Sequence, residues 1–265
     1  MGVTRIVLGA GAKKRLGARR SRARVSRMRG DDSRASIAPP RVFLLSPARL
    51  DGARARALFE PKRPGQLASA LRRREGAPIG EVFRFLSGLY FRGKLAYATR
   101  FARPPDGVAW IGSGALVITA NRGLLSAETR VCIEHLEAFA ETDIHHEERS
   151  FYAPLVRDAE LLRSAIGDEG EVVLLGSIAN AKYTAPLLEV FGDRLLFPRD
   201  FVGRGDMSRG GLLLRATEAG VELAYTKVLG ATLRGKRPPK LEPRRSTRAS
   251  AADGGAIKPR AARSA

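Results

Sequence analysis

Arg41-Val-Phe-Leu-Leu-Ser46 is a short apolar run that ends at Pro47, and it predicts a buried β-strand. Three similar runs follow along the chain: Ala115-Leu-Val-Ile-Thr119, Glu171-Val-Val-Leu-Leu175 and Arg194-Leu-Leu-Phe197. Strands that are apolar throughout are typical of parallel sheets, because both faces of such sheets are covered. Segments with helical spacing separate the runs, so the sequence predicts a three-layer α/β/α fold with a mainly parallel sheet.

Helices are predicted where apolar residues recur at three- and four-residue spacing. The predicted helices cover residues 51–78 (one or two short helices), 81–101, 131–139, 152–166, 181–191 and 207–219. Residues 221–228 alternate between apolar and polar side chains, as in a last strand. A hairpin that pairs 212–217 with 221–228 is an open alternative.

The net charge of +20 is concentrated at the two ends of the chain. Residues 1–40 contain 11 basic and 2 acidic residues, and residues 236–265 contain 9 and 2. Both ends are poor in aromatic residues, so they are predicted to be disordered basic tails around a single α/β domain at 41–235. Basic tails attract polyanions, which makes nucleic acid an expected partner. A compositional bias without a function is the alternative.

The residue inventory excludes several classes of site. Cys132 is the single cysteine, which rules out an internal disulfide and a multi-cysteine zinc site and favours a cytoplasmic location. No apolar stretch approaches the roughly 18 residues of a membrane span, so no membrane partner is expected. The Arg-rich N-terminus also fits an organelle transit peptide. His135, His145 and His146 lack metal-ligand spacing, so neither a metal nor another cofactor is expected. The oligomeric state stays open.

The strongest candidate site is Phe201-Val-Gly-Arg-Gly-Asp-Met-Ser-Arg-Gly-Gly-Leu-Leu-Leu-Arg215. Asp206 or Ser208 is placed to cap a helix that starts there. The free N–H groups of that helix, with Arg204, Ser208 and Arg209 beside them, predict an anion pocket suited to phosphate. Asp206 is also the predicted catalytic acid or base, and a helix cap paired to an arginine is the alternative interpretation.

Other strand ends carry small residues and side chains that can bind phosphate or the edge of a base. They are Ser46-Pro-Ala-Arg49, Thr119-Ala-Asn-Arg-Gly123 and Gly176-Ser-Ile-Ala-Asn-Ala-Lys-Tyr183. Gly176 and Ser177 are predicted to hold phosphate with backbone N–H groups, and Lys182 would add a positive charge. Asn121 and Arg122 are predicted to bind polar groups of the ligand. Because ligands collect at the carboxyl ends of parallel strands, these turns predict one cleft. Ordinary turn formation is the alternative.

Ser87-Gly-Leu-Tyr-Phe-Arg-Gly-Lys94 places two glycines and two basic residues inside the longest predicted helix. In a functional role, Tyr90 would stack on a base while Arg92 and Lys94 contact phosphate. The favoured interpretation is that Tyr90 and Phe91 belong to the core and that the glycines allow close packing. The roles of Arg92 and Lys94 stay open.

Residues 87–94, 118–125, 174–183 and 201–215 carry a resemblance to an uncharacterised bacterial protein family. A strand that ends in Ser, a Leu-Tyr-x-x-x-x-Lys helix and a Gly-Leu-Leu segment after the second strand also resemble, more distantly, the uracil-DNA-glycosylase-like domain associated with archaeosine synthase. That resemblance implies a three-layer α/β/α fold and a link to nucleobase or modified-nucleoside chemistry. A glycosylase's catalytic acid and histidine have no match here, so the resemblance does not carry an activity.

The sequence therefore predicts a protein that binds a nucleotide or nucleic acid at its strand ends. If the protein is an enzyme, the first reaction class to test is hydrolysis or exchange at a base-to-sugar (N-glycosidic) bond. The alternative is a non-catalytic adaptor that binds nucleic acid through its basic tails.

Overall fold

The computed structural model describes residues 38–60, 65–179, 181–232, 235–239 and 241. The predicted tails, 1–40 and 236–265, lie outside the described residues except for 38–40, 236–239 and 241. Among the described residues, no helix has both the length and the apolar character needed to cross a bilayer.

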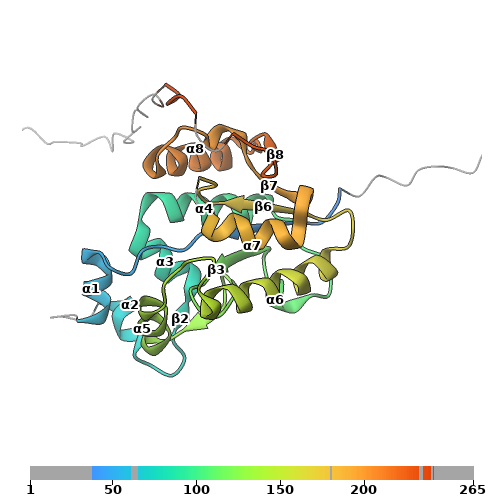
Figure 1. The fold of residues 1–265 in the computed structure, drawn as a ribbon. Helices are drawn as coiled ribbons and strands as arrows, with labels where there is room; N and C mark the ends of the chain where they lie inside the picture. Colours follow the sequence, from blue (N-terminus) through green and yellow to red (C-terminus); the bar gives the residue numbers. More distant parts are fainter. Residues whose placement is uncertain (1–37, 61–64, 180, 233–234, 240, 242–265) are drawn as a thin grey trace, which may run out of the picture. The chain divides into compact units, whose positions relative to one another are not determined.

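A six-stranded sheet runs through the described fold in the order β4-β3-β1-β6-β7-β8 (Figure 1). The inner strands β3 (Ala115–Ile118), β1 (Arg41–Leu45), β6 (Glu171–Leu175) and β7 (Leu195–Pro198) are parallel. The edge strands β4 (Leu124–Ser126) and β8 (Tyr225–Lys227) are antiparallel to their neighbours. The predicted α/β fold with a mainly parallel sheet is thus confirmed.

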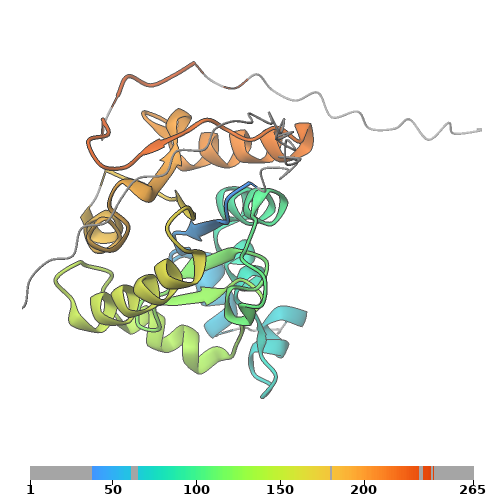
Figure 2. The same ribbon diagram turned by 90° about the vertical axis from the view of Figure 1, so that its right-hand side faces the viewer.

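Helices cover both faces of the sheet (Figures 1 and 2). On one face lie α3 (Ile79–Ser87), α4 (Leu89–Phe101) and α8 (Asp206–Ala219), with α4 packed against both others. On the other face α6 (Arg149–Ile166) packs against α7 (Ala181–Phe191). The right-handed rule for crossovers between parallel strands accounts for the opposite placement of α4 and α6, because the chain moves one way from β1 to β3 and the opposite way from β3 to β6.

The remaining elements are short and flank the sheet. They are α1 (Ala53–Phe59), α2 (Gln66–Leu71), α5 (Ile133–Glu141), the 3₁₀ turns η1 (Ala109–Ile111), η2 (Gly192–Arg194) and η3 (Arg199–Phe201), and a two-stranded sheet of β2 (Ala77–Pro78) and β5 (Arg130–Val131).

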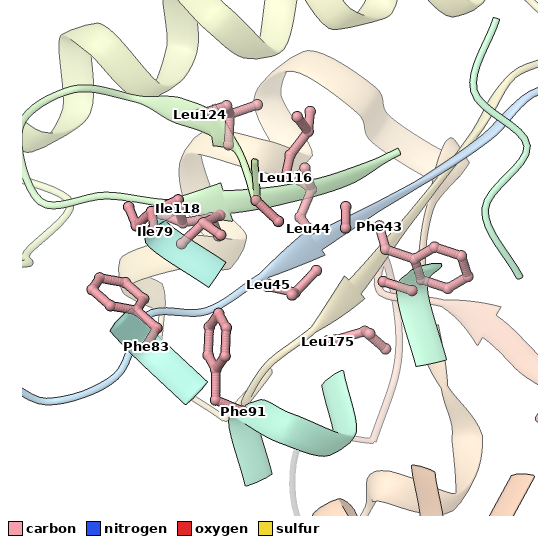
Figure 3. Close-up of a cluster of buried hydrophobic side chains, with 14 of the residues drawn as sticks. Phe43, Leu44, Leu45, Ile79, Phe83, Phe91, Leu116, Ile118, Leu124 and Leu175 are labelled. Carbon is pink, nitrogen blue, oxygen red and sulfur yellow. The ribbon is translucent and has the colours of Figure 1, made fainter. Parts of the chain in front are cut away.

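The core is built around β1, whose last four side chains are fully buried. Figure 3 shows Leu44 and Leu45 of this strand among side chains of the neighbouring strands and of the helices. Phe83 of α3 and Phe91 of α4 meet edge to face there, with ring centroids 5.5 Å apart. A strand buried on both faces is the arrangement that its continuous apolar run predicts.

The helix predicted over residues 81–101 is two helices, and this is a correction. Gly88 separates α3 from α4 with φ +63° and ψ −119°, a conformation that a side chain with a Cβ atom rarely adopts. A Cβ atom at this position would also lie 2.5 Å from Nη1 of Arg54. The apolar spacing continues across the break, so periodicity alone does not reveal it.

Residues 212–217 belong to α8, so the alternative hairpin is wrong. The strand predicted over 221–228 is confirmed only as β8, which pairs with β7 by placing Phe197 opposite Thr226. The β4 strand was not predicted, because Leu124-Leu-Ser126 is too short to show alternation.

The helices α4 and α8 touch backbone to backbone. A Cβ atom at Gly93 would lie 2.7 Å from the carbonyl oxygen of Gly210, and one at Gly210 would lie 2.8 Å from Cα of Tyr90. The prediction that the glycines after Ser87 allow close packing is therefore confirmed at Gly93. This contact sets α8, which begins at Asp206, directly beside the part of α4 that carries Tyr90.

Candidate functional site

A cavity of about 950 Å³ lies at the carboxyl ends of β1 and β6. Its wall is formed by the loop from β1 into α1, the end of α3, the start of α4, the segment after α5, and the starts of α7 and α8. Its polar and aromatic lining includes Ser46, Tyr90, Ser177, Lys182, Tyr183 and Asp206. Ligands of open α/β sheets bind at this edge, so the position of the cavity follows from the topology.

Of the residues predicted to bind phosphate or to catalyse, Ser177, Lys182 and Asp206 line this cavity, and the predicted strand end Ser46–Arg49 lines it as well. The ammonium group of Lys182 lies 4.9 Å from the centroid of the Tyr183 ring, and partial burial lowers the pKa of Lys182. The Asp206 carboxylate is 70% exposed and lies 3.6 Å from Nη1 of Arg209. The loop after β6 and the start of α8 thus meet at one site.

The side chain of Arg209 is bound by other groups of the protein. Its Nε and Nη2 atoms donate to the carbonyl oxygen of Phe201 at 3.2 and 3.1 Å, and its side chain is only 13% exposed. These bonds tie the end of η3 to the first turn of α8. Arg209 lies beside Asp206 but is not part of the cavity lining.

The expected helix cap is also corrected. The N-cap of α8 is Gly205, which has no side chain to accept a hydrogen bond, and Asp206 is the first residue of the helix. A carboxylate in the first turn still interacts favourably with the helix dipole. Neither Asp206 nor Ser208 is therefore the cap.

Arg204 and Ser208 line a different cavity, of about 370 Å³, between α8 and residues 237–239 and 241. Nη1 of Arg204 donates to Oγ of Ser208 at 3.2 Å and to the carbonyl oxygen of Pro239 at 3.3 Å. Its Nε donates to the carbonyl oxygen of Asp200 at 3.0 Å. The four predicted residues of the 203–211 segment therefore do not form one anion pocket.

The turn after β3 supports the cavity wall from outside. Nδ2 of Asn121 donates to the carbonyl oxygen of Ala138 and to Oγ1 of Thr142, both at 2.9 Å. Thr142 lines the cavity and Asn121 does not, so Asn121 fixes the end of α5. Arg122 lies outside the lining as well, and its backbone N–H donates to Oγ1 of Thr119 at 3.0 Å.

Gly176 lies outside the lining and permits a close contact between β1 and β6. A Cβ atom at Gly176 would lie 3.1 Å from Cβ of Ser46. The backbone and the hydroxyl group of Ser46 both bond to the carbonyl oxygen of Leu175, at 3.3 and 3.4 Å. The two strand ends are therefore held together beneath the cavity.

Lys94 lies beneath the same strand ends and is 1% exposed. Its Nζ atom donates to the carbonyl oxygen of Ser46 at 2.5 Å and to its Oγ at 3.0 Å. The same atom lies 4.5 Å from the centroid of Tyr90 and 4.9 Å from that of Phe91. Burial lowers the pKa of Lys94 to about 7. In the described part of the chain no carboxylate forms an ion pair with it.

The position of Lys94 in the sequence indicates that it is buried, although its residue type does not. Lys94 lies four residues after Tyr90 and three before Tyr97, so it shares their face of α4. A lysine on the apolar stripe of a helix is an exception, because lysines are almost never fully buried.

Tyr90 lines the cavity although its side chain is almost entirely buried, with 7% of the residue exposed. Its hydroxyl group has no hydrogen-bond partner among the described residues. Burial raises the pKa of this phenol, while the nearby Arg209 charge lowers it and the Asp206 charge raises it. The predicted core role of Tyr90 is thus confirmed, and its hydroxyl group lies inside the protein near Arg209.

Within the described ranges, no group of three or more His, Cys, Asp or Glu side chains is arranged to hold a metal ion. Comparison of the chain with protein-family models, with curated proteins and with solved structures found no match. Any function must therefore be argued from the cavity, and the resemblance to the glycosylase-like domain stays a prediction.

Proposed function

We propose that this protein binds a nucleotide in the 950 Å³ cavity. The observation that carries the proposal is that the cationic and aromatic side chains Lys182 and Tyr183 of α7 line the same cavity as the carboxylate Asp206 of α8. The volume lies within the range of small-molecule sites. The position at the carboxyl edge of a parallel sheet adds support, since this is where such folds bind ligands.

Each part of a nucleotide has a matching part of the lining. Phe139 and Tyr183 offer apolar surface against which a base can pack. Lys182 and Arg54 bring positive charge to the wall, and a charged donor strengthens a hydrogen bond to phosphate. The exposed carboxylate of Asp206 would accept a hydrogen bond from the sugar or from a water molecule beside it.

The reaction that we propose for this site is hydrolysis of the N-glycosidic bond. Asp206 would accept a proton from a water molecule whose oxygen bonds to the anomeric carbon of the sugar. The base would leave with the electron pair of the broken C–N bond and take up a proton from solvent, and Asp206 would later release its own proton to solvent. The exposure of Asp206 lets water reach it.

The decisive experiment titrates the full-length protein with nucleoside monophosphates. Replacing Lys182 with Met should weaken binding by about tenfold, because a charge-assisted hydrogen bond to phosphate is lost. Lys227→Met is the matched control, since Lys227 lies on β8, outside the lining, and pairs with Asp193 at 2.8 Å. Calorimetry measures both affinities. Equal affinities for wild type and Lys182→Met would contradict the proposed site.

A second variant, Asp206→Asn, tests the proposed reaction. Asp206→Asn keeps the shape of the side chain but is neutral and cannot accept the proton from water. We expect this variant to bind nucleotide with little change and to lose release of the free base, measured by chromatography. Unchanged release would remove Asp206 from the reaction while leaving the binding proposal intact.

The adaptor alternative is favoured by a separate observation, the basic residues concentrated in 1–40 and 236–265. An adaptor would bind a single-stranded oligonucleotide with steep salt dependence and would not bind mononucleotides. That combination, measured on the full-length chain, would favour the adaptor and contradict the cavity proposal.

A further inference from the structure

An exposed aromatic ring lies among arginines next to the cavity. Arg54 of α1 lines the cavity, and its Nη1 atom donates to the carbonyl oxygen of Phe85 at 3.0 Å. The apolar side chain of Phe85 is 40% exposed. Arg84 precedes it on α3, Arg92 follows on α4, and both of these side chains are exposed. We call Arg54, Arg84, Phe85 and Arg92 the basic stripe.

The break between α3 and α4 brings the members of the basic stripe together. The helix α3 turns its apolar residues into the core, so residues 84 and 85 face solvent. The guanidinium group of Arg54 covers Gly88, where a Cβ atom would lie 2.5 Å from Nη1. The backbone N–H of Arg92 donates to the carbonyl oxygen of Gly88 at 3.0 Å, so Arg92 lies one turn beyond the same glycine. Arg54 is thus placed beside both the end of α3 and the first turn of α4.

The positive charge of the basic stripe is largely uncompensated among the described residues. The Arg92 side chain forms no hydrogen bond or ion pair with them, and Arg54 bonds to a neutral carbonyl group. Arg84 pairs with Glu81 at 3.4 Å, but both side chains are about half exposed. Exposed pairs of this kind contribute little. The stripe therefore attracts anions.

Arginines around an exposed ring suit single-stranded nucleic acid better than other polyanions. A single strand presents a phosphate and an accessible base at every residue, so phosphates can meet the arginines while a base stacks on the ring. A duplex keeps its bases inside, and an acidic peptide has no bases. The combination of charge and aromatic surface therefore identifies the class of partner.

We propose that the cavity binds one nucleotide of a single-stranded nucleic acid whose neighbouring nucleotides lie along the basic stripe. Phe85 stacks on a base, and Arg84 and Arg92 contact backbone phosphates. Arg54 lies at the junction, because it belongs to both the cavity lining and the stripe. The inference rests on the proposed nucleotide function and names its substrate class, a polynucleotide in place of a free mononucleotide.

The first test compares thymidine monophosphate with a short labelled oligothymidylate on the full-length protein. Wild type should bind the oligonucleotide more tightly. Phe85→Leu keeps an apolar side chain but removes the ring, so it should weaken oligonucleotide binding by about tenfold and leave the monophosphate unchanged. Phe85→Trp should match or exceed wild type, which a merely structural role would not produce. Fluorescence anisotropy measures the oligonucleotide and calorimetry the monophosphate.

Trp110→Leu is the matched control for the aromatic ring. Trp110 is 39% exposed, close to the value for Phe85, but it lies on η1 just before β3, at the amino ends of the parallel strands. The cavity lies at their carboxyl ends. Trp110→Leu should therefore leave both affinities unchanged. Equal losses for Trp110→Leu and Phe85→Leu would overturn the proposed path of the strand.

The second test measures the salt dependence of oligonucleotide binding. Arg92→Met should reduce the slope of log affinity against log salt by about 0.7, the value for one phosphate contact on a single strand. The basic ends of the chain are the same in both proteins and cancel in the comparison. Arg163→Met removes an exposed arginine of α6, on the other face of the sheet, and should leave the slope unchanged. Equal slopes for wild type and Arg92→Met would overturn the role of Arg92.

The outcomes separate this inference from the function on which it rests. If the monophosphate binds and Lys182→Met weakens it, but Phe85→Leu leaves the oligonucleotide unchanged, the basic stripe is overturned and the cavity proposal stands. An oligonucleotide that binds no more tightly than the monophosphate would overturn the stripe as well. If the oligonucleotide binds and no mononucleotide does, the proposed function and this inference both fail.

Discussion

Replacing Lys94 with Met is expected to raise the free energy of unfolding at pH 7, and the gain should disappear as the pH approaches 10. Burial lowers the pKa of Lys94 from 10.5 to about 7 in the folded protein. Between these values the unfolded chain holds a proton that the folded chain lacks, so wild-type stability rises with pH across this window. The variant lacks this contribution, and the difference between the two proteins should change by about 3 kcal/mol.

The size of the gain at pH 7 is limited by lost hydrogen bonds. Methionine cannot donate to the carbonyl and hydroxyl oxygens of Ser46, and each such bond is worth about 1 kcal/mol. We therefore expect the variant to be about 1–3 kcal/mol more stable than wild type at pH 7 and slightly less stable near pH 10.

Urea unfolding of both proteins at several pH values between 7 and 10 measures this difference. Lys227→Met serves as the control, because Lys227 lies on the surface and its removal should give no comparable pH-dependent difference. A difference between wild type and Lys94→Met that stays constant across the range would show that Lys94 keeps its proton in the folded state.

The adjacent glycines Gly210 and Gly211 should respond in opposite ways to alanine. A Cβ atom at Gly210 would lie 2.8 Å from Cα of Tyr90 and 2.9 Å from the carbonyl oxygen of Leu89, so the backbones of α4 and α8 must separate. At Gly211 the nearest atom is Cδ1 of Leu241 at 3.4 Å, an ordinary contact. We expect Gly210→Ala to cost about 2–3 kcal/mol and Gly211→Ala to gain about 0.5–1 kcal/mol.

Chemical denaturation gives the two stabilities, and the same proteins can be titrated with nucleotide. Gly210→Ala should also weaken binding, because α8 carries Asp206 and α4 carries Tyr90 and Lys94. Gly211→Ala should bind like wild type. Equal effects of the two substitutions on stability would contradict the close approach of the helices at Gly210.

The fold could be predicted because its strands are continuous apolar runs whose burial on both faces demands helices above and below. The apolar periodicity did not reveal the end of α3, because Gly88 alone ends this helix and the apolar spacing continues past it. The short edge strand β4 was missed for a different reason. Its pairing with β3 depends on contacts across the turn at Gly123 and leaves little trace in three residues.

The site was predictable at the level of segments and less so at the level of side chains. The strand-end rule brings the first turn of α7, which contains Lys182, to the cavity that Asp206 also lines. It gives no information about Arg204 and Arg209, because a guanidinium group suited to phosphate is equally suited to backbone carbonyl oxygens, which both side chains bind.

Lys94 shows the corresponding limit for buried groups. Its partner Ser46 is 48 residues away in the sequence, and no local sequence pattern predicts a contact between residues so far apart. The apolar stripe on α4 indicates that Lys94 faces inward, but only the folded chain shows what its amine meets.

The contact of α4 with α8 leaves no layer of side chains that could absorb a displacement between them. Any tilt of α8 is therefore transmitted directly to the Tyr90 backbone. The same helix start is fastened by Arg204 to the carbonyl oxygen of Pro239, where the chain leads into its basic C-terminal stretch. A displacement of the start of α8 would therefore also act on Pro239, whose carbonyl oxygen Arg204 binds.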